Sequence, residues 1–164
     1  MTVTTGGRLV LIPARDAIIN AALAMRWVKE IGANRGQAVE AILKVVGLEP
    51  GHPWCAAFVA WCGLASLGGE WPLPKVGGCA SLAEAAALKG MLRETPANGA
   101  IFLLWSEMKG RFNHTGFVSA VATPCYTIEG NTSPDGSPEG TGVFERRRTF
   151  RPQDRFIYWW EEKT

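Results

Sequence analysis

Apolar residues recur every three or four positions through the first half of the chain, which is the spacing of amphipathic helices. This spacing predicts three helices, each followed by a glycine, over residues 14–31, 37–46 and 54–67. A fourth, shorter helix is predicted over residues 81–89, with Ser81 as its N-cap and Glu84 at the capping-box position.

The second half of the chain carries short runs of β-branched and aromatic residues separated by turn-forming residues. These runs predict about five strands, over residues 100–105, 114–121, 126–131, 142–149 and 155–160. The short connection at Thr123 and Pro124 favours pairing of the second and third of these strands as a hairpin. Helices followed by strands predict an α+β fold with an antiparallel sheet.

Composition fits a soluble globular protein, with 47% hydrophobic and 20% charged residues. A chain of 164 residues suits one domain, which we expect to span residues 1–164 with 1–13 as a flexible N-terminal segment. No apolar run is long enough to cross a bilayer. The first residues also lack the charged and apolar regions of a secretory signal.

A net charge of +2 is too small to favour binding to nucleic acid. The chain has a denser basic run near its end, made of Arg146, Arg147, Arg148, Arg151 and Arg155. We interpret this run as a solvated edge of the sheet, with binding to an anionic polymer as the alternative.

The four cysteines lack paired spacing, which favours free thiols over a disulfide framework or a structural zinc site. Cys55 follows Pro53 and Trp54 at the predicted start of a helix. Free backbone N–H groups and the helix dipole stabilise a thiolate at that place, and the same N–H groups can hold an oxyanion. The alternative is a small apolar side chain in the core. Cys62 lies on the same face but deep in the helix, where we expect core packing.

A nucleophilic thiolate needs a base, and the chain has two histidines. His114 begins a predicted strand, from which it could approach a cysteine across a groove, and it is the favoured base. His52 lies in the loop before the helix, and nothing in that loop aims its ring at the sulfur. On the next strand Glu129 and Asn131 share a face, so either could accept a hydrogen bond from His114, although the register is not fixed by the sequence. Alternatively, these two residues only close the strand and start a turn.

Two further residues are candidate substrate contacts. Trp54 stands next to Cys55 and could wall a substrate groove, or it could pack in the core. Asn113 directly precedes His114.

The segments PWCAAFV, NHTGFV and IEGN, in this order, resemble the CHAP cysteine amidase/peptidase domains of the NlpC/P60 superfamily. The resemblance covers residues 15–160 and implies a papain-like fold, with the cysteine-bearing helix packed on the sheet. It implies Cys55 as nucleophile, His114 as base and Glu129 as the orienting residue, with Asn131 assisting. The second oxyanion donor, besides the N–H of Cys55, is not identified by the sequence.

The resemblance also implies a substrate and a setting. Most of the family cleaves amide bonds of peptidoglycan, either between N-acetylmuramic acid and L-alanine or within the stem peptide or cross-bridge. The chemistry uses no metal or cofactor, although some members hold a structural calcium ion; Asp135 and Glu139 are the only acids in the long polar loop here.

We therefore expect a monomer made in the bacterial cytoplasm that reaches the wall by release, injection or virion delivery, as an endolysin or antibacterial effector would. Its expected protein partners are a cognate inhibitor or a delivery machinery. Two alternatives stay open: a cysteine amidase or acyl transferase with a non-wall substrate, and a non-catalytic binding module that kept the fold.

Overall fold

The computed structural model describes residues 2–5, 8–11, 13–135 and 140–160. In this part of the chain the first half forms four α-helices: α1 (Ala14–Ala24), α2 (Gln37–Val45), α3 (Cys55–Leu67) and α4 (Cys79–Leu88). A short 3-10 helix, η1 (Gly68–Glu70), follows α3. The first three helices begin and end close to the positions that the apolar spacing predicts, except at the end of α1.

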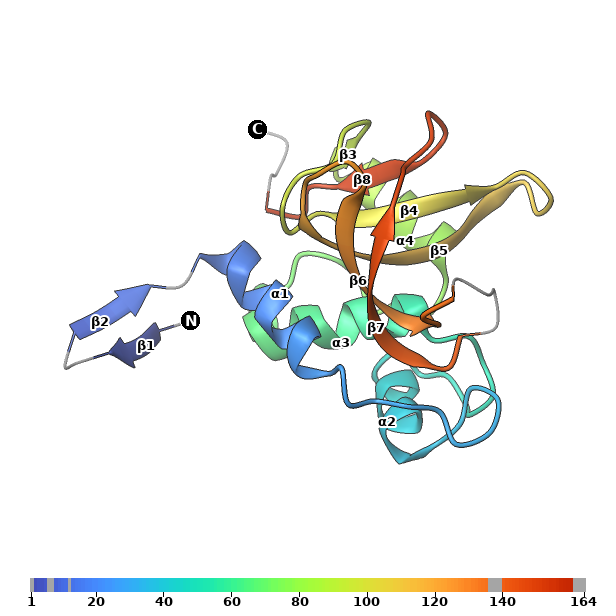
Figure 1. Ribbon diagram of the computed structural model, residues 1–164, viewed down its shortest axis with the longest axis horizontal. Helices are drawn as coiled ribbons and strands as arrows, with labels where there is room; N and C mark the ends of the chain where they lie inside the picture. Colours follow the sequence, from blue (N-terminus) through green and yellow to red (C-terminus); the bar gives the residue numbers. More distant parts are fainter. Residues whose placement is uncertain (1, 6–7, 12, 136–139, 161–164) are drawn as a thin grey trace.

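The second half forms a six-stranded antiparallel sheet in the order β3-β8-β4-β5-β6-β7 (Figure 1). Its strands are β3 (Leu92–Arg93), β4 (Ile101–Ser106), β5 (Arg111–Ala120), β6 (Cys125–Thr132), β7 (Gly142–Arg148) and β8 (Arg155–Ile157). The α+β class and the β5–β6 hairpin are confirmed. The sequence did not predict β3, which is too short to show a pattern. Two further strands, β1 (Thr2–Thr5) and β2 (Arg8–Leu11), pair with each other.

Two helix boundaries differ from the prediction. Helix α1 ends at Ala24 rather than near residue 31, because the chain turns and then runs beside β7. There the carbonyl of Val28 accepts from the N–H of Val143 at 3.1 Å, so Val28 is buried by edge pairing and not by helix packing. Helix α4 begins at Cys79 with Gly78 as N-cap, so Ser81 lies inside the helix and does not cap it.

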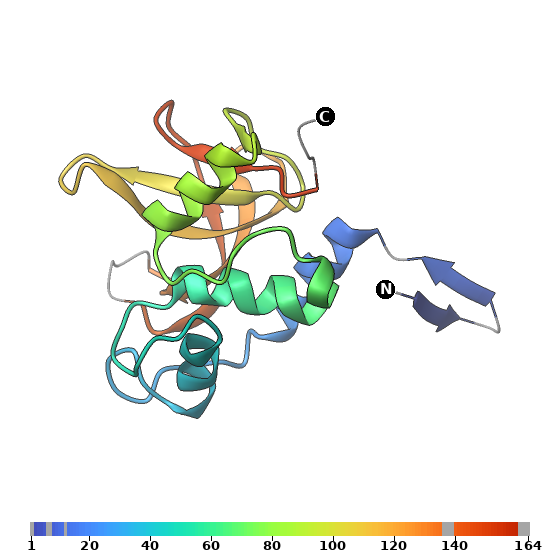
Figure 2. The same cartoon turned by 180° about the vertical axis from the view of Figure 1, so that it is seen from behind.

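Helix α3 is buried between the sheet and the other helices. It packs against α1, α2, β5 and β6, and Figure 2 shows it running between the sheet and α2. Its residues from Cys55 to Ala60 are all buried, as expected for a helix that is apolar all round. The sheet approaches α3 closely at Gly130 of β6, where an added Cβ would meet Phe58 at 2.6 Å. The glycine of the IEGN segment therefore lets the sheet approach the helix that starts at Cys55.

The sheet strands contribute alternate residues to two cores. Ile101 and Leu103 of β4 join the main core around α3, and Phe102 between them belongs to a smaller cluster with Val118, Cys125 and Phe156. His114 lies in phase with Val118 on β5, and its ring centroid is 6.0 Å from that of Phe102. The histidine thus sits where the two cores meet.

Candidate active site

Cys55 is the first residue of α3, with Trp54 at the N-cap position. The Trp54 carbonyl accepts the first helical hydrogen bond from the N–H of Phe58 at 2.8 Å, which leaves the N–H groups of the first turn without helical partners. The thiol is 6% exposed and borders a surface pocket. Pro53 precedes the N-cap and lies just outside the helix. The placement of Cys55 at the helix start is as predicted.

His114 and Glu129 are joined by a hydrogen bond of 2.7 Å between Nε2 and Oε1. His114 stands at an irregular point of β5, because the β4 partners Leu104 and Trp105 pair with His114 and Phe112 and leave Asn113 as an extra residue. Such bulges re-aim side chains and are frequent beside active sites. Since Nε2 is taken by Glu129, Nδ1 is the ring nitrogen left to face the sulfur.

Glu129 is a fully buried carboxylate that accepts hydrogen bonds from three side chains. Besides His114, the hydroxyl of Thr127 donates to Oε2 at 2.6 Å, and Arg148 donates from Nε at 2.6 Å and from Nη2 at 2.7 Å. Burial alone would raise the pKa of Glu129, but the hydrogen bonds and charges of His114 and Arg148 lower it to about 2. The group is therefore an anion that holds the imidazole in one orientation.

The sulfur of Cys55 and the ring of His114 interact directly. A hydrogen bond with Cys79 is the largest cause that lowers the pKa of Cys55; burial opposes it, and His114 and the backbone of Thr115 lower it further. Burial would lower the pKa of His114, but hydrogen bonds to Cys55 and Glu129 raise it to about 9. Between these two pKa values the pair exists as thiolate and imidazolium, which is the reactive form of a cysteine nucleophile.

Cys79 is a neighbour of the nucleophile that the sequence did not identify. Its sulfur lies 3.6 Å from that of Cys55, and it is the first residue of α4. The hydrogen bond to Cys55, burial and the charge of the neighbouring thiolate all raise the pKa of Cys79, so Cys79 keeps its proton and can donate it to the Cys55 thiolate. Cys62, by contrast, is sealed in the core as predicted, and burial raises its pKa.

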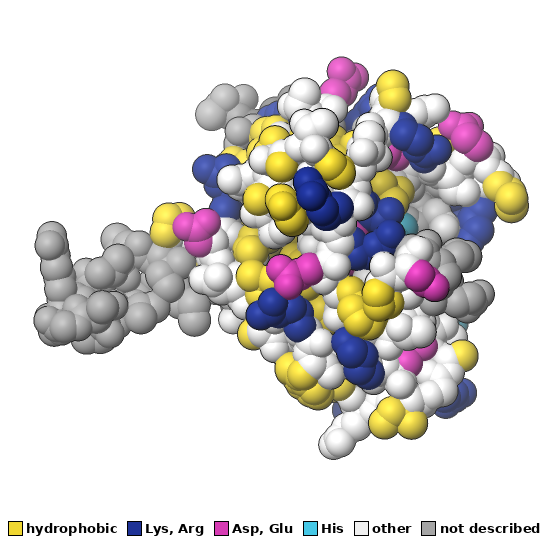
Figure 3. All heavy atoms as spheres, viewed as in Figure 1, with side chains coloured by type: hydrophobic (Ala, Val, Ile, Leu, Met, Phe, Trp, Pro, Cys, Tyr) yellow, Lys and Arg dark blue, Asp and Glu magenta, His cyan; other side chains and the backbone are white. Residues whose placement is uncertain are grey.

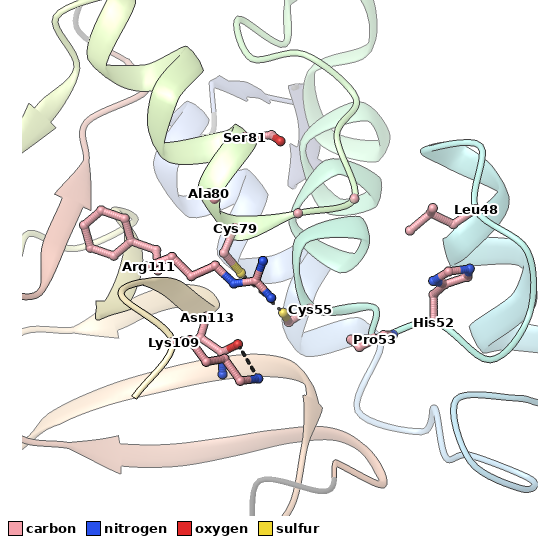
Figure 4. A pocket seen from close by; sticks show the side chains of 13 residues that line it. Leu48, His52, Pro53, Cys55, Cys79, Ala80, Ser81, Lys109, Arg111 and Asn113 are labelled. Carbon is pink, nitrogen blue, oxygen red and sulfur yellow. Dashed lines mark hydrogen bonds between the residues drawn. The ribbon is translucent and has the colours of Figure 1, made fainter. Parts of the chain in front are cut away.

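The pocket beside Cys55 has a volume of about 450 Å³. Figure 4 shows that its wall combines the loop before α3, the start of α4 and the first residues of β5. Asn113 lines this pocket, as a candidate substrate contact should, and its Oδ1 accepts from Nζ of Lys109 at 2.9 Å. His52 also lines it, but the ring that interacts with the sulfur is that of His114.

Trp54 and Asn131 do not join the arrangement as expected. Trp54 is completely buried, and its indole N–H donates to Oε1 of Glu30 at 2.8 Å, so it cannot wall an open groove and that prediction is wrong. Asn131 lies in an irregular part of β6 with φ of 52°. Within the described part of the chain it makes no hydrogen bond to His114, and its assisting role stays a prediction.

The basic run near the end of the chain is divided between two environments. Alternation along β7 turns Arg148 inward to Glu129, whereas Arg147 is exposed and stacks on Tyr126. The interpretation as a solvated edge is therefore wrong for Arg148. On the face drawn in Figure 3, lysines and arginines are interspersed with acidic side chains rather than gathered in one patch.

Among the described residues no group of three or more His, Cys, Asp or Glu side chains is placed to hold a metal ion. Of the two acids considered for calcium, Glu139 lies outside the described residues. None of the described helices is long and apolar enough to cross a membrane.

A buried helix that presents a cysteine to a sheet-borne histidine and acid is the arrangement of papain-like cysteine hydrolases. The family model of the CHAP domain matches residues 47–131, just over half of the chain, and the chain belongs to the CHAP family. This family consists generally of cysteine-dependent amidases and peptidases, typically acting on peptidoglycan. No curated protein and no solved structure matches the chain. The match is shorter than the resemblance suggested, and Arg148 lies beyond it.

Proposed function

We propose that the protein hydrolyses amide bonds of peptidoglycan, with Cys55 as nucleophile, His114 as acid and base, and Glu129 as the residue that orients the imidazole. The observation that carries the proposal is the chain of contacts from the Cys55 sulfur through His114 to the Glu129 carboxylate, beside an open pocket. The bond cut is either the N-acetylmuramoyl-L-alanine amide or a peptide bond of the stem or cross-bridge.

The first half-reaction forms an acyl-enzyme. The Cys55 thiolate attacks the amide carbonyl carbon, and the resulting oxyanion accepts from the free N–H of Cys55 at the helix start. The tetrahedral intermediate then collapses, the C–N bond breaks, and the His114 imidazolium gives its proton to the leaving amine. The products of this step are a thioester at Cys55, a neutral imidazole and the free amine.

The second half-reaction restores the enzyme. Neutral His114 takes a proton from water, the hydroxide adds to the thioester carbonyl, and the C–S bond breaks to release a carboxylic acid and the thiolate. Glu129 stays ionised throughout, because its depressed pKa of about 2 lies far below neutral pH. It keeps the ring oriented and stabilises the imidazolium of the first step.

The proposal extends to where the protein acts. It would be made in the bacterial cytoplasm and reach the wall after release, injection or virion delivery. The wall substrate typical of the CHAP family is the reason to place its action at the wall, and the route by which it arrives stays a prediction.

Purified sacculi test the proposal. Wild-type protein should release soluble muropeptides, and mass spectrometry of those fragments identifies the bond by the new amine and carboxyl ends. Cys55→Ala should abolish release. Cys62→Ala is the matched control, because it removes a thiol from the same helix without touching the site, and it should keep most of the activity. Intact sacculi of every cross-link type after treatment with folded wild-type protein would contradict the proposal.

A further inference from the structure

The pocket beside the nucleophile is lined by cationic side chains that form no ion pair with an Asp or Glu among the described residues. Two of its lining residues, Lys109 and Arg111, are cations, and none of the described lining residues is an Asp or Glu. The ammonium of Lys109 donates to the neutral amide of Asn113 and forms no ion pair among the described residues. An open pocket of about 450 Å³ with this lining is suited to an anionic ligand group.

Arg111 is a second cation close to the sulfurs of the site, besides His114. In Figure 4 its guanidinium extends from β5 across the pocket to the pair formed by Cys55 and Cys79. Its charge also acts on the site. The hydrogen bond with Cys55 and burial raise the pKa of Cys79, and the positive charge of Arg111 opposes this rise. Among the described residues, no side chain forms a hydrogen bond or ion pair with this guanidinium.

A structural role does not account for this placement. The half-buried arginine of the site, Arg148, donates two hydrogen bonds to Glu129, whereas Arg111 is exposed and its guanidinium has no side-chain partner among the described residues. Guanidinium is a planar donor that matches a carboxylate with two parallel hydrogen bonds. The start of α4, at Cys79 to Ser81, lines the same pocket and adds backbone N–H groups at its positive end.

We propose that Arg111, assisted by Lys109, binds a free carboxylate of the substrate, so that the enzyme prefers amides flanked by an acidic residue or a free chain end. The inference rests on the proposed amide hydrolysis and names the chemical class of its substrate. Binding of the carboxylate in this pocket places the scissile carbonyl of the same molecule over the Cys55 sulfur. Arg111 is then a specificity-determining residue.

Two alkylating reagents test the inference without needing hydrolysis. Iodoacetate and iodoacetamide react with the same thiolate but differ in charge, so the ratio of their rates at Cys55 reports attraction of a carboxylate. The rates are measured by peptide mass spectrometry, which separates Cys55 from Cys79. Arg111→Gln should lower the iodoacetate-to-iodoacetamide ratio by about tenfold, as expected for loss of a hydrogen-bonded charge partner. Arg147→Gln, which removes an exposed arginine outside the pocket, should leave the ratio unchanged.

The outcomes are distinct. An unchanged ratio in Arg111→Gln overturns the inference, and so does an equal slowing of both reagents, which would mean that Arg111 only stabilises the thiolate. A second readout uses soluble wall fragments before and after conversion of their carboxylates to carboxamides. Wild type should cleave the untreated fragments about tenfold faster, and Arg111→Gln should cleave both forms alike. If neither form is cleaved, the proposed function fails, while the alkylation ratio still decides the inference.

Discussion

The sulfur of Cys79 lies 3.6 Å from the sulfur of Cys55, and each is the first residue of its own helix. The two thiols are not equivalent, because the pKa of Cys55 is lowered and that of Cys79 is raised. Cys79 is therefore the hydrogen-bond donor and Cys55 the acceptor. This contact gives the nucleophile a second stabilising partner besides His114.

Replacing Cys79 should weaken the nucleophile without removing it. In Cys79→Ala the thiolate of Cys55 loses its strongest hydrogen bond, so alkylation of Cys55 at pH 6 should slow by about tenfold, the usual effect of losing a hydrogen bond to a charged group. Cys79→Ser keeps a donor and should recover most of the rate. An unchanged rate in the alanine variant would show that Cys79 does not support the thiolate.

The same contact predicts the product of mild oxidation. Hydrogen peroxide should convert the Cys55 thiolate to a sulfenic acid, and the Cys79 thiol should then displace water to form a disulfide. Peptide mapping should find the two cysteines linked, and dithiothreitol should restore activity. In Cys79→Ala the oxidation of Cys55 should proceed to the sulfinic acid, which dithiothreitol does not reduce. Wild-type protein that accumulates this acid at Cys55 with Cys79 reduced would contradict the prediction.

Arg148 should act as a positioning residue for the site. Arg148→Met removes the charge partner of a buried carboxylate, and we expect the free energy of unfolding to fall by about 3 kcal/mol. Hydrolysis should slow by between about ten- and a hundredfold, because Glu129 no longer holds the imidazole in place. Arg148→Lys should recover stability better than activity, since lysine supplies charge without the planar fork.

Urea unfolding and the rate of muropeptide release check this prediction. Arg147→Gln is the matched control, because it neutralises the adjacent arginine on the exposed face. Full stability and activity in Arg148→Met would show that the contact with Glu129 is dispensable.

Glu129 should make the fold sensitive to acid. Its pKa falls from 4.5 to about 2 in the folded protein, so its stabilisation is fully present above pH 4.5 and is lost as the pH falls through about 2. Glu129→Gln lacks this group, so its free energy of unfolding should be lower at pH 7 and should change less between pH 5 and pH 2.5. Urea unfolding at these pH values measures both. Parallel curves for the two proteins would contradict the assignment of a buried, ionised Glu129.

The sequence predicted the parts of the site that depend on local rules. Cys55 was found from its place at a helix start and His114 from its place at a strand start. Strand alternation left Glu129 and Asn131 as equal candidates, and only the resemblance to CHAP domains favoured Glu129. Their partners depend on packing between distant elements: Cys79 comes from another helix, 24 residues after Cys55, and Arg148 from a strand 19 residues after Glu129. Alternation shows that Arg146 and Arg148 share a face, but not that this face is turned toward a buried acid.

The errors in the fold have a similar origin. The apolar spacing of residues 14–31 continues beyond Ala24 because Val28 is buried against β7, and a buried strand-like residue cannot be told from a helical one by spacing alone. Trp54 was a candidate for a groove wall because it adjoins the nucleophile, but the alternative of core packing holds, since its large apolar ring is buried and packs on Phe58. In both places tertiary contacts, and not the local sequence pattern, determine which side chains are buried.

The pH dependence of Cys55 alkylation by iodoacetamide tests the central claim most directly, because the account rests on a thiolate held beside imidazolium. In wild-type protein the rate should rise through an inflection well below the value of about 8.5 for an ordinary thiol and should change again near pH 9 as His114 loses its proton. In His114→Gln the lower inflection should move up and the upper one should vanish. A single inflection near 8.5 in wild type, unmoved by His114→Gln, would contradict the claim.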